Sequence, residues 1–212
     1  MIGENLLTSP GNCEIKKEHL METMKSIEAR RSIRKFKPLP VPQNIVHTVL
    51  RAATLAPSGK NKQPWKFYVI QGDKRQEVAD VMWKGIQRLE ESGINTGSAK
   101  FSLKIMEQAP VTIIIFNPSS KNPFLKRDTI EVFSDVVDIQ SIGAAIQNML
   151  LAALDFGLGS LWICDIFAAY EELSDWFDEK GEMIAAVSLG YPDQFPNARP
   201  RHPVEDVAVF LD

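Results

Sequence analysis

Apolar side chains recur every three or four residues in five stretches of the chain, and this spacing predicts helices with one buried face. The predicted helices span residues 16–30, 42–53, 73–91, 134–154 and 171–177. The first would bury Leu20, Met24 and Ile27, and the second would bury Ile45, Val46, Val49, Leu50 and Ala53. Pro42 and Asp73 suit the beginnings of the second and third helices, because proline tolerates the first turn and aspartate is a common N-cap.

The helix predicted over residues 134–154 differs from the others, because it is apolar almost all round. Its apolar residues are Ile139, Ile142, Ala145, Ile146, Met149, Leu150 and Ala153. This pattern is typical of a helix at the centre of a domain. Gly157 follows the helix, where a glycine commonly provides the left-handed residue that ends one.

Short runs of β-branched and aromatic residues predict strands at 66–70, 111–116, 160–164 and 183–189. The run 111–116 is continuously apolar, so we expect that strand to be buried on both faces. Helices and strands alternate along the chain, which predicts an α/β or α+β domain with three layers. The periodicity alone leaves the direction of the strands open.

The two ends of the chain lack such patterns. Residues 1–15 show no apolar period and contain Gly3, Pro10 and Gly11, so they are predicted to form an irregular extension before a single domain of residues 16–212. The proline-rich tail over 193–212 is expected to be extended. Residues 93–98 and 117–123 are predicted to form loops.

The composition is that of an ordinary globular protein. The chain has 212 residues, 44% of them hydrophobic, and a net charge of −3, which gives no basic excess for nucleic acid. The only cysteines, Cys13 and Cys164, cannot form a disulfide framework, which favours a reducing compartment. Residues 1–12 do not resemble a secretory signal. Because the apolar runs are also short, we expect a soluble, cytoplasmic protein with no membrane or nucleic-acid partner.

Two groups of basic residues could bind an anion. One short stretch combines cations and a hydroxyl that could grip a phosphate, namely Arg30, Arg31, Ser32, Arg34, Lys35 and Lys37. Arg199 and Arg201 alternate in a segment expected to be extended, so both could reach one anion. The plainer interpretations are a solvated helix end and a solvated tail.

Two further segments could lie against a ligand. Residues 56–65, Ala-Pro-Ser-Gly-Lys-Asn-Lys-Gln-Pro-Trp, carry amides, a hydroxyl and a glycine between a helix and a strand. Residues 157–165, Gly-Leu-Gly-Ser-Leu-Trp-Ile-Cys-Asp, turn through glycines into a strand that could pass under a flat ring. An ordinary loop, with Trp65 in the core, and a simple helix end are the alternatives.

Other chemistries have little support. His19, His47 and His202 lack the spacing of metal ligands, so no metal is expected. No phosphate-binding P-loop or Gly-x-Ser-x-Gly turn occurs. Cys164 lies on a predicted apolar strand, where a small buried residue is a better interpretation than a nucleophile. These patterns single out no catalytic side chain.

Taken together and in order, the four segments resemble the nitroreductase family over about residues 18–206. The quoted motifs are Arg-Arg-Ser-Ile-Arg-Lys-Phe at 30–36, the segment 56–65, Gln-Asn-Met-Leu-Leu-Ala-Ala at 147–153 with the strand after it, and Gly-Tyr-Pro at 190–192 followed by 199–203. The resemblance implies an α+β three-layer sandwich with a central, mainly antiparallel sheet flanked by helices. It also implies an intertwined homodimer with one FMN in each of two sites at its interface.

The resemblance also assigns cofactor-binding roles. Arg30 and Arg201 would hold the FMN phosphate, with Arg199 and Ser32 beside them, and Arg34 would sit against N1 and O2 of the flavin. Pro57, Ser58, Gly59 and Asn61 would come from the partner subunit, and Ser141 would face the pyrimidine edge or the ribityl chain. Trp162, Ile163, Cys164 and Asp165 would run along one face of the ring and offer backbone N–H to N5. Arg31 and Gln63 complete the predicted set.

The chain departs from the family at Asp165, since many members carry a glycine at or near the end of that strand. A carboxylate beside N5 would oppose the charge of reduced flavin. We expect Asp165 to turn away, so that only its backbone contributes; the alternative is a flavin that is harder to reduce.

The implied activity is ping-pong reduction of nitroaromatics, quinones or related acceptors, with NADH or NADPH as electron donor. One alternative is reductive dehalogenation of the iodotyrosine deiodinase type, which needs a tyrosine on a lid. Tyr68, Tyr170 and Tyr191 all lie outside the lid segments expected at 84–107 and 117–134. The other alternative is a non-enzymatic FMN-binding redox protein.

Overall fold

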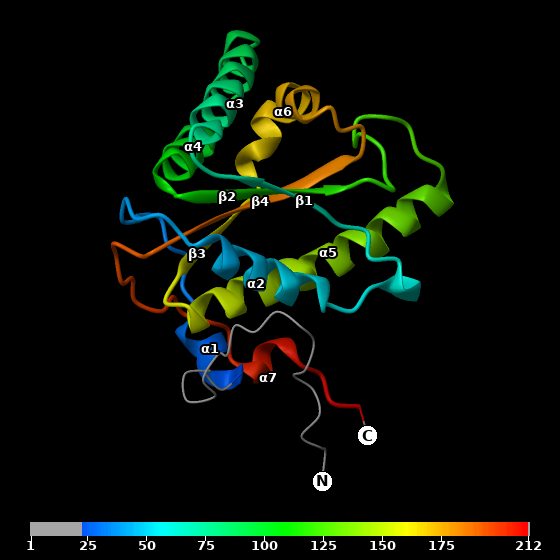
Figure 1. Ribbon diagram of the computed structural model, residues 1–212. Helices are drawn as coiled ribbons and strands as arrows, with labels where there is room; N and C mark the ends of the chain where they lie inside the picture. Colours follow the sequence, from blue (N-terminus) through cyan, green and yellow to red (C-terminus); the bar gives the residue numbers. More distant parts are fainter. Residues whose placement is uncertain (1–22, 212) are drawn as a thin grey trace.

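A four-stranded sheet forms the centre of the computed structural model, which describes residues 23–211. The strands are β1 (Lys66–Ile70), β2 (Val111–Asn117), β3 (Gly159–Ile163) and β4 (Glu182–Gly190). They lie in the order β1-β2-β4-β3, and every neighbouring pair is antiparallel. Helices α2 and α5 cover one face, and α3, α4 and α6 cover the other (Figure 1). The domain is therefore α+β with three layers, as the sequence predicts.

Strand β2 has no solvent-exposed face, because all seven of its residues are buried. Ile113 and Ile115 pack in the core beneath α2 and α5, whereas Ile114 and Phe116 pack in the core on the opposite face. The prediction of a strand buried on both faces is confirmed. Burial of this kind usually marks a parallel sheet, but here two helical layers cover an antiparallel one.

Helix α2 (Gln43–Thr54) agrees with its predicted pattern, because Val46, Val49 and Ala53 are buried against α5 and the sheet. Ile45 and Leu50 pack at the edge of the same core.

Helix α5 (Thr129–Asp155) begins five residues earlier than predicted. The reason is a capping box, in which the Asp128 carboxylate accepts from the Glu131 N–H while the Glu131 carboxylate accepts from the Asp128 N–H. At the other end, Gly157 has a φ of +67°, as expected of the residue that ends a helix.

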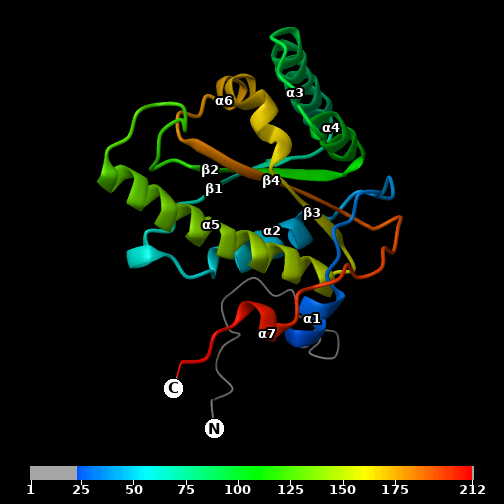
Figure 2. The same ribbon diagram turned by 180° about the vertical axis from the view of Figure 1, so that it is seen from behind.

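Only the C-terminal half of α5 is central. Ile142, Ile146 and Met149 are fully buried, but the first half extends beyond the sheet (Figures 1 and 2). There Ile130 is 76% and Phe133 66% exposed, and the other exposed apolar residues are Val132, Val136, Val137 and Ile139. The prediction of a helix central along its whole length is thus wrong for its first half. By length and hydropathy alone α5 also qualifies as a membrane span, a test that core helices of globular proteins pass as well.

The opposite layer contains α3 (Lys74–Glu91), α4 (Ala99–Gln108), a 3₁₀ turn, η3 (Asp165–Ala169), and α6 (Tyr170–Phe177). Asp73 stands at the N-cap position of α3, as predicted, but its side chain makes no capping hydrogen bond. Helix α4 is missing from the prediction, which treated residues 84–107 as a lid. In the structure α4 buries Leu103, Ile105 and Met106. Helix α4 is therefore part of the core.

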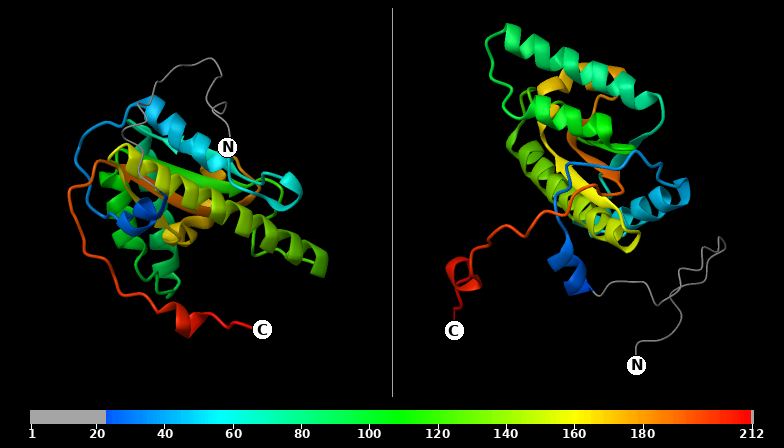
Figure 3. Two further views of the ribbon diagram at one scale, coloured as in Figure 1. Left: turned by 90° about the horizontal axis from the view of Figure 1, so that it is seen from below. Right: turned by 90° about the vertical axis from the view of Figure 1, so that its left-hand side faces the viewer.

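The two ends of the described chain lie away from the sheet (Figure 3). Within the described residues helix α1 covers Thr23–Ala29, and its Met24 and Ile27 are exposed, so the buried face predicted for it is wrong there. Leu20 and the predicted extension over 1–15 lie outside the described residues. The tail is extended, as predicted, apart from a single turn, α7 (Val204–Val207).

A buried carboxyl at the start of β4 generates a prediction about pH. Burial raises the pKa of Glu182, and the neighbouring carboxylates of Asp135 and Asp138 add to this effect against Ser120 and Arg127. The native state therefore holds this proton more tightly than the unfolded state, so Glu182 lowers stability as pH rises above its ordinary value of 4.5. Glu182→Gln should remove that decline, as measured by urea unfolding between pH 5 and pH 8.

Glu179 provides a control of opposite sign. Although burial opposes it, hydrogen bonds from Lys66, Gly181 and Tyr68 give a net lowering of the pKa of Glu179. Its stabilising effect is present above its ordinary pKa and is lost as pH falls. Glu179→Gln should therefore lower the free energy of unfolding near neutral pH. Equal pH profiles for the two variants would contradict this assignment.

Candidate functional site

All of the predicted basic residues except Lys35 and Lys37 line one cavity of about 270 Å³. One wall is formed by the segment that follows α1, and the other by the tail after β4. The lining residues are Glu28, Arg30, Arg31, Ser32, Arg34, Pro196, Asn197, Ala198, Arg199 and Arg201. The structure thus brings both predicted basic groups together, and the tail residues just before Arg199 are additions that the sequence did not single out.

Not every arginine in this cavity is free to bind a ligand. The Arg31 guanidinium donates to the carbonyl oxygens of Glu28, at 2.5 Å, and of Arg30, at 2.9 Å. These carbonyls belong to the end of α1, so Arg31 caps that helix, as in the plainer interpretation of the cluster. Arg34 makes a longer bond, of 3.3 Å, to the Ser32 carbonyl.

Arg30 and Arg201 lie close enough to repel one another. Burial lowers the pKa of Arg30, and the charges of Arg201 and Arg31 lower it further. The only side-chain hydrogen bond of Arg201 in the described chain is to the carbonyl of neighbouring Pro200. Like charges held together at a partly buried position favour a bound anion, which would offset their repulsion.

The basic cavity adjoins the free edge of β3. Ser32 forms a parallel bridge with Ser160, and the Ile33 N–H donates to the Ser160 carbonyl at 2.9 Å. Gly159 permits this approach, since a Cβ there would lie 2.6 Å from Cγ1 of Ile33. Backbone groups of alternate residues point to the same edge, so the Trp162 N–H faces this open side as the Ser160 carbonyl does. This is the edge at which the family resemblance predicts that backbone N–H groups face a flavin ring.

The residues at the end of β3 point in different directions. Ile163 is buried in the core, whereas Trp162 is 38% exposed and its indole passes near Gly143 of α5. Cys164 is exposed, so its expected burial is wrong: the strand ends at Ile163, one residue before it. Partial desolvation and the charge of Asp165 raise the pKa of the Cys164 thiol. The thiol is therefore protonated at neutral pH and a poor nucleophile.

Asp165 is turned toward the helical layer. Its carboxylate accepts hydrogen bonds from the Ser98 hydroxyl, at 2.8 Å, and from the Ser102 hydroxyl. Both serines belong to the beginning of α4, where a negative charge is also favoured by the helix dipole. This orientation agrees with the expectation that only the backbone of Asp165 faces the β3 edge. The sequence carried no signal for these serines, because α4 itself was not predicted.

The loop over 56–65 is packed against α5. The Gly59 N–H donates to Oγ of Ser141 at 3.3 Å, and Oγ of Ser58 accepts from the Gln63 N–H at 3.0 Å. Pro57, Asn61 and Gln63 are exposed. Trp65 packs at the edge of the core, as in the ordinary-loop interpretation. Ser141 is thereby grouped with this loop.

The loop and the basic cavity are separated within one chain. The loop lies at one end of the layer formed by α2 and α5, and α1 lies at the other end (Figures 1 and 2). The two halves of the predicted site therefore do not meet in a single chain.

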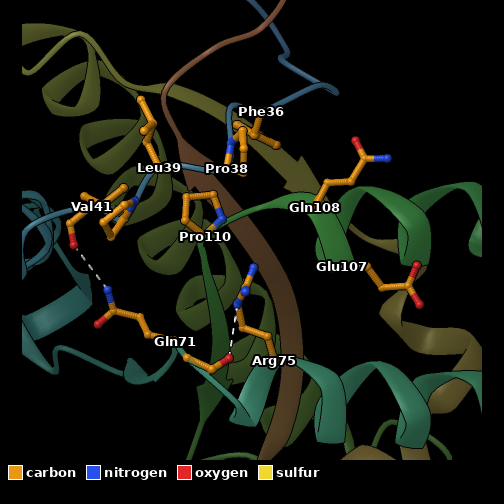
Figure 4. Close-up of a pocket in the computed structure, with 11 residues that line it drawn as sticks. Phe36, Pro38, Leu39, Val41, Gln71, Arg75, Glu107, Gln108 and Pro110 are labelled. Carbon is orange, nitrogen blue, oxygen red and sulfur yellow. Dashed lines mark hydrogen bonds between the residues drawn. The ribbon is translucent and has the colours of Figure 1, made fainter.

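A larger cavity, of about 530 Å³, contains none of the predicted residues (Figure 4). Its walls include Pro38, Leu39 and Pro110, and its one arginine, Arg75, donates to the carbonyls of Gly72 and Ala109. That guanidinium is committed to the backbone. Within residues 23–211, no group of three or more His, Cys, Asp or Glu side chains is placed to hold a metal ion.

Comparison with known proteins identifies the family. The model of the nitroreductase family matches residues 27–191. The NADPH-flavin oxidoreductase of Vibrio harveyi is 29% identical over 189 residues, which cover 87% of this chain and 72% of that protein.

Solved structures share the fold. A BluB-like flavoprotein from Clostridium difficile 630 superposes with a TM-score of 0.74 at 28% identity, over 91% of this chain and 100% of that one. A "putative nitroreductase in complex with FMN" from Desulfovibrio desulfuricans gives a TM-score of 0.68 at 28% identity, over 89% and 96% of the two chains. The chain belongs to the nitroreductase family, and it is an enzyme of the NAD(P)H nitroreductase and flavin oxidoreductase type.

The close approach at Gly159 generates a second prediction. Gly159→Ala should destabilise the protein by about 1–3 kcal/mol, because the new methyl group overlaps the branched side chain of Ile33. Urea unfolding measures the effect. In the double variant with Ile33→Ala, the two changes should cost less than the sum of the single ones, since the closest contact, with Cγ1 at 2.6 Å, is removed and only that with Cβ, at 2.9 Å, remains. Additive costs would show that the two residues do not press on each other.

Proposed function

We propose that this chain is an FMN-dependent oxidoreductase that takes electrons from NADH or NADPH and passes them to a small aromatic or quinone-like acceptor. The observation that carries the proposal is the basic cavity beside the open edge of β3. It offers an anion site and a row of backbone groups next to each other, which is what a phosphate joined to a flat ring requires.

Arg30, Arg199 and Arg201 are the groups suited to the phosphate. They converge from both ends of the domain on one cavity, and their mutual repulsion is relieved when a dianion is bound. Ser32 adds a hydroxyl at the same place. Arg31 supports the site indirectly, because it holds the end of α1 from which Arg30 projects.

The ring would lie along β3. The Trp162 N–H faces the open edge, and the backbone of Ile163, Cys164 and Asp165 continues beyond it. When bound, FMN supplies the redox chemistry, accepting two electrons and a proton from the nicotinamide and returning them to the acceptor. Arg34 would place a cation near the ring and favour its reduced form. No protein nucleophile is needed, and the protonated Cys164 thiol is consistent with that.

The second half of each site would come from a partner subunit, so that the protein acts as a homodimer. One chain holds the loop over 56–65 at the opposite end of the α2 and α5 layer from its basic cavity. The exposed apolar first half of α5, with Ile130 and Phe133, provides a surface that a second copy would cover. The tail adds exposed Val207, Phe210 and Leu211.

The tyrosines do not favour a dehalogenase. The Tyr170 hydroxyl donates to the Gly181 carbonyl and accepts from the Met183 N–H, and it is buried. Tyr68 donates to Glu179 within a cluster of aromatic rings. Both are committed to the core, and Tyr191 packs against the α2 and α5 core. Reduction of nitroaromatics or quinones therefore remains the better proposal.

The direct test is to purify the protein and examine its flavin. The expected result is a yellow dimer by light scattering, with one FMN per subunit. It should oxidise NADH or NADPH when a quinone or a nitroarene is added. A colourless protein that takes up no added FMN, or a flavin-loaded monomer, would contradict the proposal.

Arg201→Ala should weaken FMN binding by roughly tenfold or more, because one charge-assisted contact to the phosphate is lost. The fold should be unaffected, since Arg201 is exposed and bonds only to its neighbour. FMN titration of the apoprotein measures the change, with Lys37→Ala as an exposed basic control outside the cavity. Unchanged affinity would show that Arg201 is a solvated tail residue that does not contact the phosphate.

Arg34→Met should lower the two-electron midpoint potential by about 30–65 mV. This range follows if the cation favours the reduced ring by one charged hydrogen bond, roughly 1.5–3 kcal/mol. Arg34→Lys keeps the charge without the planar fork, so its shift should be smaller. Potentiometry of the three proteins provides the measurement, and equal potentials would remove Arg34 from the vicinity of the ring.

A further inference from the structure

The loop over 58–63 has an unusual backbone. Four residues other than glycine have a positive φ in the described chain, and three of them are Lys60, Asn61 and Gln63, with φ of 53°, 55° and 50°. Asparagine adopts this conformation readily, whereas lysine and glutamine seldom do. Strained residues of this kind persist only where the surroundings hold them, and they concentrate at ligand sites.

One buried carboxylate holds the loop to α5. Lys62 lies between the left-handed residues, and its ammonium pairs with Oδ2 of Asp138 at 2.5 Å. The side chain of Asp138 is 4% exposed, and the same oxygen accepts from the Asn117 amide at 3.1 Å. The carboxylate thus joins the loop, α5 and the end of β2 at one point.

Two further contacts press the loop against the same helix. The Gly59 N–H reaches Oγ of Ser141, whose own hydroxyl donates to the Val137 carbonyl at 2.8 Å. A Cβ on Gly59 would lie 2.4 Å from Cγ1 of Val137, so the backbone approaches α5 as closely as glycine allows. These contacts hold the strained backbone of the loop against α5.

We propose that Asp138 is a positioning residue that holds the 58–63 loop in the shape required to contact FMN. The inference rests on the proposed function and deepens it. By binding Lys62, the carboxylate keeps that side chain against α5, while Asn61 and Gln63 stay exposed on the outer side of the loop. A loop ordered in advance loses less conformational freedom on binding, and the affinity rises accordingly.

Asp138→Asn tests the role of the charge, since it keeps the size of the side chain. We expect the FMN dissociation constant of this variant to be about tenfold higher than that of the wild type, or more. The visible absorption spectrum of the bound flavin should also change. Asp135→Asn is the matched control, because Asp135 is also on α5 but pairs with Arg127 and not with a residue of the loop. It should lower thermal stability and leave the FMN dissociation constant and the spectrum unchanged.

Lys62→Met tests the same ion pair from the other side, because it removes the partner of Asp138. Lys62 is exposed, so this variant should fold even if Asp138→Asn does not. It should raise the FMN dissociation constant by a similar factor. The double variant should be no weaker than either single one, because both remove the same contact. If both variants bind FMN as the wild type does, or if their effects simply multiply, the positioning role is wrong.

The wild-type titration separates this outcome from failure of the proposed function. A wild-type protein that takes up no FMN contradicts the proposed function itself. A wild type that binds FMN, alongside Asp138 and Lys62 variants that bind it equally well, contradicts the positioning role alone.

Discussion

Strand β2 is buried on both faces, and this constraint organises the rest of the molecule. Its residues, and those of β4 beside it, must be covered on both sides, so one helical layer lies over each face of the sheet. What these layers leave uncovered is an edge. The Trp162 N–H faces this edge beyond the bridge at Ser160, and the segment after α1 brings arginines to the same place. The candidate site is therefore a consequence of how the core is closed.

Much of the fold could be predicted from the sequence, because apolar spacing reports burial directly. The four strands were placed to within one or two residues, and α2 buries the stripe that its spacing predicts. The errors arose where spacing says little. The early start of α5 depends on the reciprocal bonds of Asp128 and Glu131, and α4 was missed because its segment was interpreted as a lid. Met24 and Ile27 have helical spacing, but the described chain puts nothing over them.

For the site, the sequence predicted that the two basic segments could reach one anion, but not what each side chain does there. Arg30 and Arg201 do converge, although most of the chain separates them. Arg31 looks equivalent to Arg30 in the motif, yet its guanidinium is hydrogen-bonded to the end of α1. Asp165 turns toward Ser98 and Ser102, and Ser141 lies under a loop. Arg31 bonds to carbonyls of the adjoining helix end, whereas the partners of Asp165 and Ser141 lie far away in the sequence, and a motif specifies neither kind of contact.

The separation of the loop from the basic cavity in one chain has a kinetic consequence. On the proposed dimer, a complete pocket exists only after two chains have met, so its formation is second order in chain concentration. Newly made chains at low abundance would remain empty even with ample cofactor, and loading would accelerate as they accumulate. The amount of protein in the cell would then set the fraction that is active, and expression level would act as a threshold for the enzyme.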